Sequence, residues 1–317
     1  MTVLICPLDW GLGHATRCVP IINNFIRQGD KVVIAASNLP MAFLKNEFPQ
    51  LQFEYLPSYN VTYSKGKSQT GAMLRNIPKI LSGIYAEHRW LKNFLQKNKI
   101  DTVVSDNRFG LWSKQAHCIY MTHQLMIKMP ENLHFMEKLL WRIHRFFINR
   151  YNECWIPDVE NSTVNFAGDL AHKFPLPQNA KFIGVLSRFS HLAGIQPNTS
   201  FSVVCIVSGV EPQRSIFEIF LLETFKNSTQ KILMIQGKPQ KKNQKTVNGN
   251  ITVVSHLETK TLASYLVGTQ HIICRSGYST IMDLVALNCL KKAQFFPTPG
   301  QTEQEYLAKY HNNQSAR

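Results

Sequence analysis

The sequence is poor in acidic residues, and this shortage narrows the kinds of partner that the protein can have. Only 20 Asp and Glu stand against 35 Lys and Arg, which gives a formal net charge of +15. Such a balance indicates an acidic partner: nucleic acid, an anionic membrane surface or a phosphorylated ligand. No run of basic residues with interleaved aromatic residues marks a nucleic-acid module, so we expect no nucleic-acid partner.

Paired cysteines, a signal sequence and long apolar runs are also missing. The seven cysteines are scattered without a Cys-x-x-Cys spacing, and the first predicted strand, residues 3–6, starts too early to follow a secretion signal. These absences predict free thiols in a reducing cytosol. No apolar run is as long as a membrane span. We therefore expect a cytoplasmic protein, soluble or peripheral on the inner face of the membrane.

The residues that are present predict a folded protein with two domains. The chain has 317 residues, of which 44% are hydrophobic and 17% charged, enough for two cores of ordinary size. A polar segment without clear periodicity, residues 187–200, is the predicted linker. We expect an N-terminal domain over residues 1–190 and a C-terminal domain over residues 200–317.

The N-terminus has the strand–turn–helix–strand pattern of a Rossmann-like unit. A strand at residues 3–6 leads into a glycine turn, then a helix at residues 19–28 and a strand at residues 31–36. Only Gly11 and Gly13 are present in the turn, so it is a weak dinucleotide fingerprint, and the glycines predict a tight strand-to-helix turn. Histidines such as His14 beside such a turn are more often solvated or capping residues than catalytic ones.

Short apolar runs predict the remaining strands. In the first domain they lie at residues 53–56, 102–105, 118–121, 155–157 and 181–183, and in the second at 202–207, 232–235, 251–254, 272–274 and 293–296. Asp106 follows one of these strands, and His123 follows the next. The carboxylate of Asp106 either caps the following segment or orients His14 from a neighbouring strand.

Two further segments of the first domain allow a structural and a functional interpretation. Residues 58–79 are polar and basic, with Lys65, Lys67, Arg75 and Lys79, and predict either a flap over a substrate or a surface loop. Residues 133–150 carry a helical apolar stripe among basic residues, formed by Met136, Leu139, Leu140, Ile143 and Phe147. This helix either packs its stripe on the core or lies on an anionic membrane.

The second domain has two places where a strand turns directly into a helix. The strand at 202–207 ends in Ser208 and Gly209 before a helix at 213–225, and the strand at 272–274 ends in Arg275, Ser276 and Gly277 before a helix at 280–288. Such helix starts leave N–H groups free to bind an anion. Because these loops lie at the carboxyl ends of predicted parallel strands, they indicate a nucleotide site.

The C-terminal stretch resembles the donor half of the two-domain GT-B glycosyltransferases. It is most similar to family 28, which includes the lipid-linked N-acetylglucosaminyltransferase of peptidoglycan synthesis. The resemblance assigns Arg275, Ser276 and Gly277 to the turn at the donor, and Asp283 to the acid that holds the ribose. It further implies that the glutamines of the proline-bounded loop, Gln301 and Gln304, contact the sugar. From the residues alone, Asp283 three positions after Thr280 is the acid of a capping box.

The same resemblance assigns the rest of the site. Ser208 and Gly209 stand in place of the family's phosphate loop, although the family has more glycines there, and Leu257 stands where the base is bound. On the acceptor side it implies Gly11, Gly13, Arg17 and His123, with His14 as the catalytic base and Asp106 as its partner. The Gly-x-Gly-His pattern is also similar to that of related nucleotide-sugar hydrolases.

These assignments imply an α/β protein of GT-B architecture, with two Rossmann-like parallel-sheet domains facing a cleft. The expected reaction is inverting transfer of a sugar from a UDP-linked donor to a lipid-linked or glycan acceptor. We expect no metal and no cofactor, because the sequence has no Asp-x-Asp motif or His/Cys cluster. The alternatives are a nucleotide-sugar hydrolase and a non-catalytic nucleotide-sugar-binding or membrane-surface subunit. The second is favoured by the short C-terminus, in which no segment is predicted to cross back onto the first domain.

Overall fold

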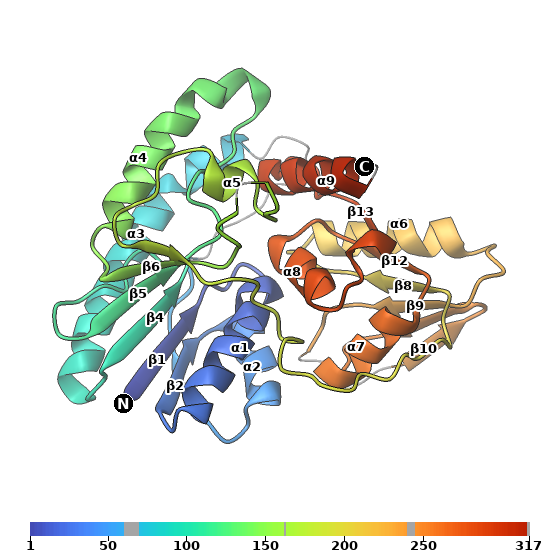
Figure 1. Cartoon of the computed structure of the whole chain (residues 1–317), viewed down its shortest axis with the longest axis horizontal. Helices are drawn as coiled ribbons and strands as arrows, with labels where there is room; N and C mark the ends of the chain where they lie inside the picture. The colour runs from blue at the N-terminus through green and yellow to red at the C-terminus, as the bar shows by residue number, and fades with distance from the viewer. Residues whose placement is uncertain (60–69, 162, 240–244, 316–317) are drawn as a thin grey trace.

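The computed structural model describes residues 1–59, 70–161, 163–239 and 245–315, with the side chains of residues 70–76 and 313–315 excepted. The described chain forms two α/β halves, each built on its own sheet (Figure 1). This confirms the predicted GT-B class with two Rossmann-like domains.

The first sheet is parallel and has the strand order β3-β2-β1-β4-β5-β6-β7. Its strands are β1 (Thr2–Pro7), β2 (Lys31–Ala36), β3 (Gln52–Tyr55), β4 (Thr102–Asp106), β5 (His117–Met121), β6 (Glu153–Ile156) and β7 (Ala180–Phe182). In β1, the four residues from Val3 to Cys6 are fully buried, because helices cover both faces of a parallel sheet.

The helices of this half are α1 (Leu12–Arg27), α2 (Asn38–Glu47), α3 (Thr70–Lys97), the 3₁₀ helix η1 (Glu131–Met136), α4 (Glu137–Ile148) and α5 (Asp169–His172). Helix α1 starts seven residues before its predicted start at Val19. Gly11 makes this early start feasible, since its φ of 104° lies in the region that favours glycine. As a result, His14 and Arg17 belong to the first turns of α1.

The second sheet has the order β10-β11-β9-β8-β12-β13. Its elements are β8 (Val203–Ile206), α6 (Gln213–Phe225), β9 (Ile232–Ile235), β10 (Lys245–Asn248), β11 (Ile251–Val254), α7 (Thr259–Gly268), β12 (His271–Cys274), α8 (Tyr278–Ala286), η2 (Leu290–Lys292), β13 (Ala293–Phe295) and α9 (Thr302–Ser315). The prediction of a parallel sheet holds except at β10, an exposed edge strand that runs antiparallel to β11.

Helix α9 returns to the first half of the molecule, so the expectation that no segment crosses back was wrong (Figure 1). Tyr306 Oη accepts a 2.7 Å hydrogen bond from the backbone N–H of Asp169. One turn further on, the backbone carbonyl oxygens of Asn165 and Phe166 lie 3.2 Å from Tyr310 Oη and 3.0 Å from His311 Nε2. The sequence of α9 is mostly polar, and these hydrogen bonds join it to the first half while its Leu307 and Ala308 are buried in the core.

The predicted flap at residues 58–79 lies only partly within the described residues. Residues 60–69, with Lys65 and Lys67, lie outside them. Residues 70–79 are not irregular: they form the start of the long helix α3. The sequence prediction therefore assigned the start of a helix to a loop.

Helix α4 buries only part of the apolar stripe that the sequence indicated. Its buried residues are Glu137, Trp141, His144 and Ile148, whereas Leu139 and Ile143 are 52% and 47% exposed. The helix packs on the core with its basic residues in water, as the structural interpretation predicted, but it does so through Trp141, His144 and Ile148 and not through Leu139 and Ile143. Within the described residues, helices that are both long and apolar enough to cross a bilayer are absent.

Candidate functional site

The predicted site residues lie at the two positions where the strand order reverses. In the first sheet this position lies between β1 and β4, where Pro7 is paired in register with Asp106. In the second it lies between β8 and β12. Such switch points, at the carboxyl ends of the strands, are where open α/β sheets bind ligands. The glycine turn, Asp106 and both helix-start loops of the second half are thus gathered at ligand-binding edges.

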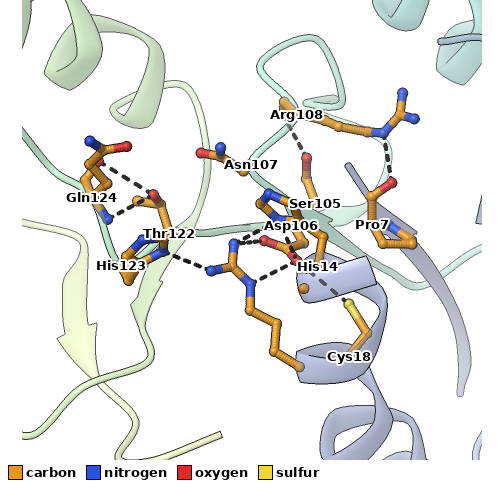
Figure 2. A network of polar contacts seen from close by, with 12 residues as sticks. Pro7, His14, Cys18, Ser105, Asp106, Asn107, Arg108, Thr122, His123 and Gln124 are labelled. Atoms are coloured by element: carbon orange, nitrogen blue, oxygen red, sulfur yellow. Dashed lines mark hydrogen bonds and ion pairs between the residues drawn. The ribbon is translucent and has the colours of Figure 1, made fainter. Parts of the chain in front are cut away.

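His14, Asp106 and His123 converge in the first half (Figure 2). His14 Nδ1 lies 3.1 Å from Asp106 Oδ2. Arg17 donates from Nε to the same oxygen over 2.8 Å, and its Nη2 forms a close ion pair with Oδ1. Asp106 is fully buried, while the His14 side chain keeps 16% of its surface exposed. The histidine is therefore the member of the pair that a substrate can reach.

The pKa values of Asp106 and His14 are both lowered, for different reasons. Burial alone would raise the pKa of Asp106, but Arg17 and His14 outweigh it and lower this pKa to about 2. For His14, burial is the largest influence and lowers the pKa, and Asp106 offsets this only in part. Near neutral pH, Asp106 is thus an anion and His14 a neutral imidazole, the state that can accept a proton.

Two residues of the second half, Glu303 and Tyr278, reach this cluster, and the sequence did not place either in the site. Arg17 Nη1 lies 2.8 Å from His123 Nδ1, and His123 Nε2 lies 2.8 Å from Glu303 Oε1. The ring of Tyr278 stacks on that of His123 with centroids 4.1 Å apart. Glu303 stands in the polar cluster with Gln301 and Gln304, which was the only local signal for it.

Gly13 lies where the two halves touch. A Cβ atom built on it would lie 2.5 Å from Ser279 Oγ of α8, so any larger residue would force the Ser279 hydroxyl to move. Gly11 is needed for its positive φ, and Gly13 leaves room for the Ser279 side chain at this contact. The first turn of α1, with His14, thus faces the start of α8.

On the other side of this contact, α8 starts at Tyr278 after Gly277, and no side chain caps it. Ser276 Oγ donates 2.7 Å to the carbonyl of Gln304. Gln304 in turn braces the proline-bounded loop: its Oε1 accepts from the N–H of Thr298 at 2.9 Å, and its Nε2 donates to Gln301 Oε1 at 2.7 Å. The structure therefore brings the predicted helix start and the glutamine loop together.

The loop after β8 approaches the same edge. It contains Ser208 and Gly209, whose φ of 111° again requires glycine, and leads into α6. Leu257, after β11, is partly buried against the main core. Its side chain packs there, so any contact with a nucleotide base would be made by the backbone.

Arg275 is buried, and its guanidinium points at backbone carbonyls. Nη1 donates to Pro297 O at 2.8 Å, Nη2 donates to Gln213 O at 3.2 Å, and the group lies 4.0 Å from the centroid of the Phe217 ring. Burial lowers its pKa to about 10, which leaves it charged. In this position Arg275 ties the proline-bounded loop to the start of α6, and so shapes the predicted anion site.

Asp283 lies inside α8 and is bonded to the segment that joins the two halves. Its Oδ1 accepts a 2.6 Å hydrogen bond from Ser187 Oγ, and its Oδ2 lies 3.4 Å from Arg188 Nε. The capping-box interpretation was wrong, since α8 begins two residues before Thr280. Among the described residues, no group of three or more His, Cys, Asp or Glu is arranged as metal ligands, and we assign none to a metal.

No protein-family model matches the sequence, and no curated protein is significantly similar to it. Solved structures are similar in fold. The spinosyn rhamnosyltransferase SpnG with bound thymidine diphosphate has a TM-score of 0.59 and 13% identity over 100% of this chain and 90% of its own. UGT2 of Phytolacca americana, with UDP-2-fluoro-glucose and pterostilbene, has a TM-score of 0.58 and 12% identity, over 98% and 83%.

A third structure of the same fold is named for a different activity. It is a putative UDP-N-acetylglucosamine 2-epimerase from Listeria monocytogenes, with a TM-score of 0.55 and 10% identity over 99% of this chain and 89% of its own. These likenesses establish the architecture: the chain has the two-domain fold of the GT-B glycosyltransferases.

Proposed function

We propose that the protein is an inverting glycosyltransferase that moves a sugar from a nucleotide diphosphate sugar, with UDP as the expected nucleotide, to a lipid-linked or glycan acceptor. The observation that carries the proposal is the His14–Asp106 pair at the switch point of the first sheet, facing the start of α8. In the same fold, one solved structure holds thymidine diphosphate and another a UDP-sugar analogue, which supports a nucleotide sugar as the donor.

The pair suits the removal of a proton from an acceptor hydroxyl. His14 Nδ1 contacts both Asp106 Oδ2, at 3.1 Å, and Arg17 Nη2, at 3.0 Å. The mechanism requires the tautomer in which the Nδ1 proton is donated to Asp106, because only then does Nε2 have a lone pair that can accept the proton of the acceptor. The acceptor oxygen then bonds to the anomeric carbon from the face opposite the leaving group, and the bond from that carbon to the diphosphate oxygen breaks. The proton stays on His14, whose charge Asp106 offsets.

The second half would bind the leaving nucleotide diphosphate. The uncapped start of α8 at Gly277 and the loop of Ser208 and Gly209 offer N–H groups and a helix dipole to its negative charge. Gln301 lies on the adjoining loop and Gln304 in the first turn of α9. Because the Gln304 amide is bonded to Thr298 and Gln301, it would exchange one of these bonds to bind a sugar hydroxyl. The nucleotide sugar is consumed in this reaction, so it is a substrate and not a cofactor.

A nucleotide-sugar hydrolase remains the rival, with water in place of the acceptor, because the same base and the same donor site would serve it. The non-catalytic subunit loses its main support, since helix α9 does cross back onto the first half.

The proposal also includes the place where the protein would meet its acceptor, the surface of a membrane. Helix α4 exposes three apolar side chains, Leu139, Ile143 and Phe146. Lys138 and Arg142 are exposed beside them. An amphipathic surface with basic margins fits the interface of an anionic membrane. We therefore expect a cytoplasmic protein that lies peripherally on a membrane, where a lipid-linked acceptor would be presented.

The test is a panel of UDP- and TDP-sugars, each offered with and without membrane lipid extracts and glycans. Release of nucleotide and formation of a glycosylated product are measured together. The proposal expects release that depends on an acceptor and a product that carries the sugar. Release of free sugar without any acceptor would establish the hydrolase instead, and tight nucleotide binding without turnover would establish the non-catalytic subunit.

A further inference from the structure

The donor half of the molecule reaches into the acceptor half through Glu303. This residue lies in the first turn of α9, and its Oε1 is 2.8 Å from Nε2 of His123, a residue 180 positions earlier in the chain. Tyr278 of α8 holds the flat side of the same imidazole, stacked at 4.1 Å with an interplanar angle of 7°. Two elements of the donor half thus fix one histidine of the acceptor half.

The chemistry of the partners sets the position of the ring proton. A guanidinium can only donate hydrogen bonds, so the 2.8 Å contact between Arg17 Nη1 and His123 Nδ1 requires a lone pair on Nδ1. The ring proton therefore lies on Nε2, where Glu303 accepts it. The anion of Glu303 stabilises this tautomer. If Glu303 were replaced by a water, or by no partner, the ring could turn over or change tautomer.

A series of contacts connects His123 to His14, the proposed base. Arg17 contacts His123 through Nη1 and Asp106 through Nε and Nη2, and its Nη2 also lies 3.0 Å from His14 Nδ1. Asp106 in turn holds the Nδ1 side of His14. Arg17 and His123 are only 4% and 7% exposed, so few waters can replace a lost partner, and a shift at one end of the series is passed to the next side chain.

We propose that Glu303 is a positioning residue that couples contact between the two halves to the alignment of His14. When α9 and α8 meet the first half, Glu303 locks His123, His123 orients Arg17, and Arg17 sets Asp106 behind His14. The base is then aligned only when the donor half is in place. This inference rests on the proposed role of His14 as the base, but the link itself can be tested without any substrate.

The first experiment observes the ring nitrogens of His123 by ¹⁵N NMR in the full chain. His123→Phe, which keeps an aromatic ring on Tyr278 but has no nitrogens, assigns the signals by difference. Wild type should show the Nε2–H tautomer, and Glu303→Ala should change it to a mixture, while Lys309→Ala, an exposed position on the same helix, should not. Unchanged His123 signals in Glu303→Ala would overturn the proposal, whatever reaction the protein catalyses.

The second experiment is kinetic and separates positioning from substrate binding. Glu303→Ala should lower kcat by about 10- to 100-fold, the scale of a misaligned catalytic group, with the donor KM changed less than about threefold. Glu303→Gln keeps an acceptor oxygen and should recover part of kcat. The double variant Glu303→Ala/His123→Phe should be no slower than the slower single variant, because both break one link.

A rise in donor KM at unchanged kcat would mean that Glu303 only holds the sugar, and would refute the positioning role. The role would also be refuted if the kcat losses of the two single variants multiplied in the double variant. If wild type transfers no sugar, the proposed function fails, and the NMR result still decides whether Glu303 fixes His123.

Discussion

Ser187 Oγ donates a 2.6 Å hydrogen bond to Asp283 Oδ1, so the segment between the two sheets already occupies the carboxylate that the resemblance assigns to the ribose. Burial raises the pKa of Asp283, although Arg188 and Ser187 oppose this rise. A ribose hydroxyl and the Ser187 hydroxyl are the same kind of donor, so they would compete for the Oδ1 atom that Ser187 occupies. Nucleotide binding at Asp283 would therefore have to displace Ser187 or use the second oxygen.

Substitutions on the two sides of this bond separate the roles of Asp283. Asp283→Asn should weaken UDP binding by about 1.5–3 kcal/mol, the range for hydrogen bonds to a charged group, and should also lower the melting temperature because Arg188 loses its ion pair. Ser187→Ala removes the competing donor and should leave UDP affinity equal or higher. Calorimetric titration with UDP measures both. Unchanged affinity in Asp283→Asn, with a loss of stability alone, would mean that the residue only anchors the connecting segment.

Asp106 is expected to matter for folding as well as for turnover. It is the buried anion against which Arg17 is paired, and removal of one partner of a buried ion pair typically costs about 3–5 kcal/mol. Asp106→Asn should therefore lower the free energy of unfolding by several kcal/mol, measured by urea denaturation. The double variant Asp106→Asn/Arg17→Met, which buries no unpaired charge, should recover much of that loss. No recovery would show that the pair is not the source of the cost.

The exposed apolar side chains of α4 predict binding to anionic lipid. Wild type should sediment with phosphatidylglycerol vesicles, remain in solution with phosphatidylcholine, and dissociate at high salt, because each basic contact contributes only about 1 kcal/mol and is screened. Replacing Leu139, Ile143 and Phe146 together by Ser should abolish sedimentation. The matched control replaces Ile216, Ile219 and Phe220, the exposed apolar residues of α6 in the other half, and should sediment like wild type. Equal behaviour of the two triple variants would contradict the assignment to α4.

Strands were predictable because strands of a parallel sheet that are buried on both faces are short, continuous apolar runs. The predicted ranges 31–36, 232–235 and 251–254 coincide with β2, β9 and β11. Helices were harder to predict where their apolar residues do not mark the buried side. In α4 two residues of the apolar stripe, Leu139 and Ile143, face solvent. In α9 the contacts with the first half include tyrosine hydroxyls and a histidine.

Only those parts of the site that are formed by residues close together in the sequence could be predicted. The turn from Gly11 to Arg17 and the turn from Arg275 to Gly277 each have a recognisable pattern of residues. The link from Glu303 to His123 joins residues 180 positions apart and leaves no periodic or compositional signal. The same is true of Ser187 and Asp283, since a polar residue in a predicted linker does not reveal which helix it will meet.

Buried His144 predicts a loss of stability in mild acid. Its Nδ1 lies 3.2 Å from the carbonyl of Leu125, and burial lowers its pKa to about 4. The unfolded chain, with an ordinary histidine pKa of about 6.5, binds a proton in this window while the folded protein does not. Stability therefore falls as the pH drops from about 6.5 towards 4, by about 1.4 kcal/mol per pH unit for one proton.

The measurement is urea unfolding at pH 6.5 and 4.5. Between these values His144→Gln should lose about 2 kcal/mol less than wild type, although it starts from a lower stability. His191→Gln, at an exposed position, is the control and should follow wild type. A His144→Gln variant with the full wild-type pH dependence would show that other groups are responsible.

The central claim is that His14 removes the proton of an acceptor hydroxyl, and one variant tests it most directly. General base catalysis of this kind is typically worth about 10²–10⁴-fold. With the donor and acceptor identified by the panel above, His14→Ala should lower kcat by that factor and leave UDP affinity, measured by calorimetric titration, unchanged, because the expected nucleotide site lies in the other half of the molecule. Near-normal turnover of His14→Ala with the same acceptor, or loss of UDP binding in place of turnover, would contradict the account.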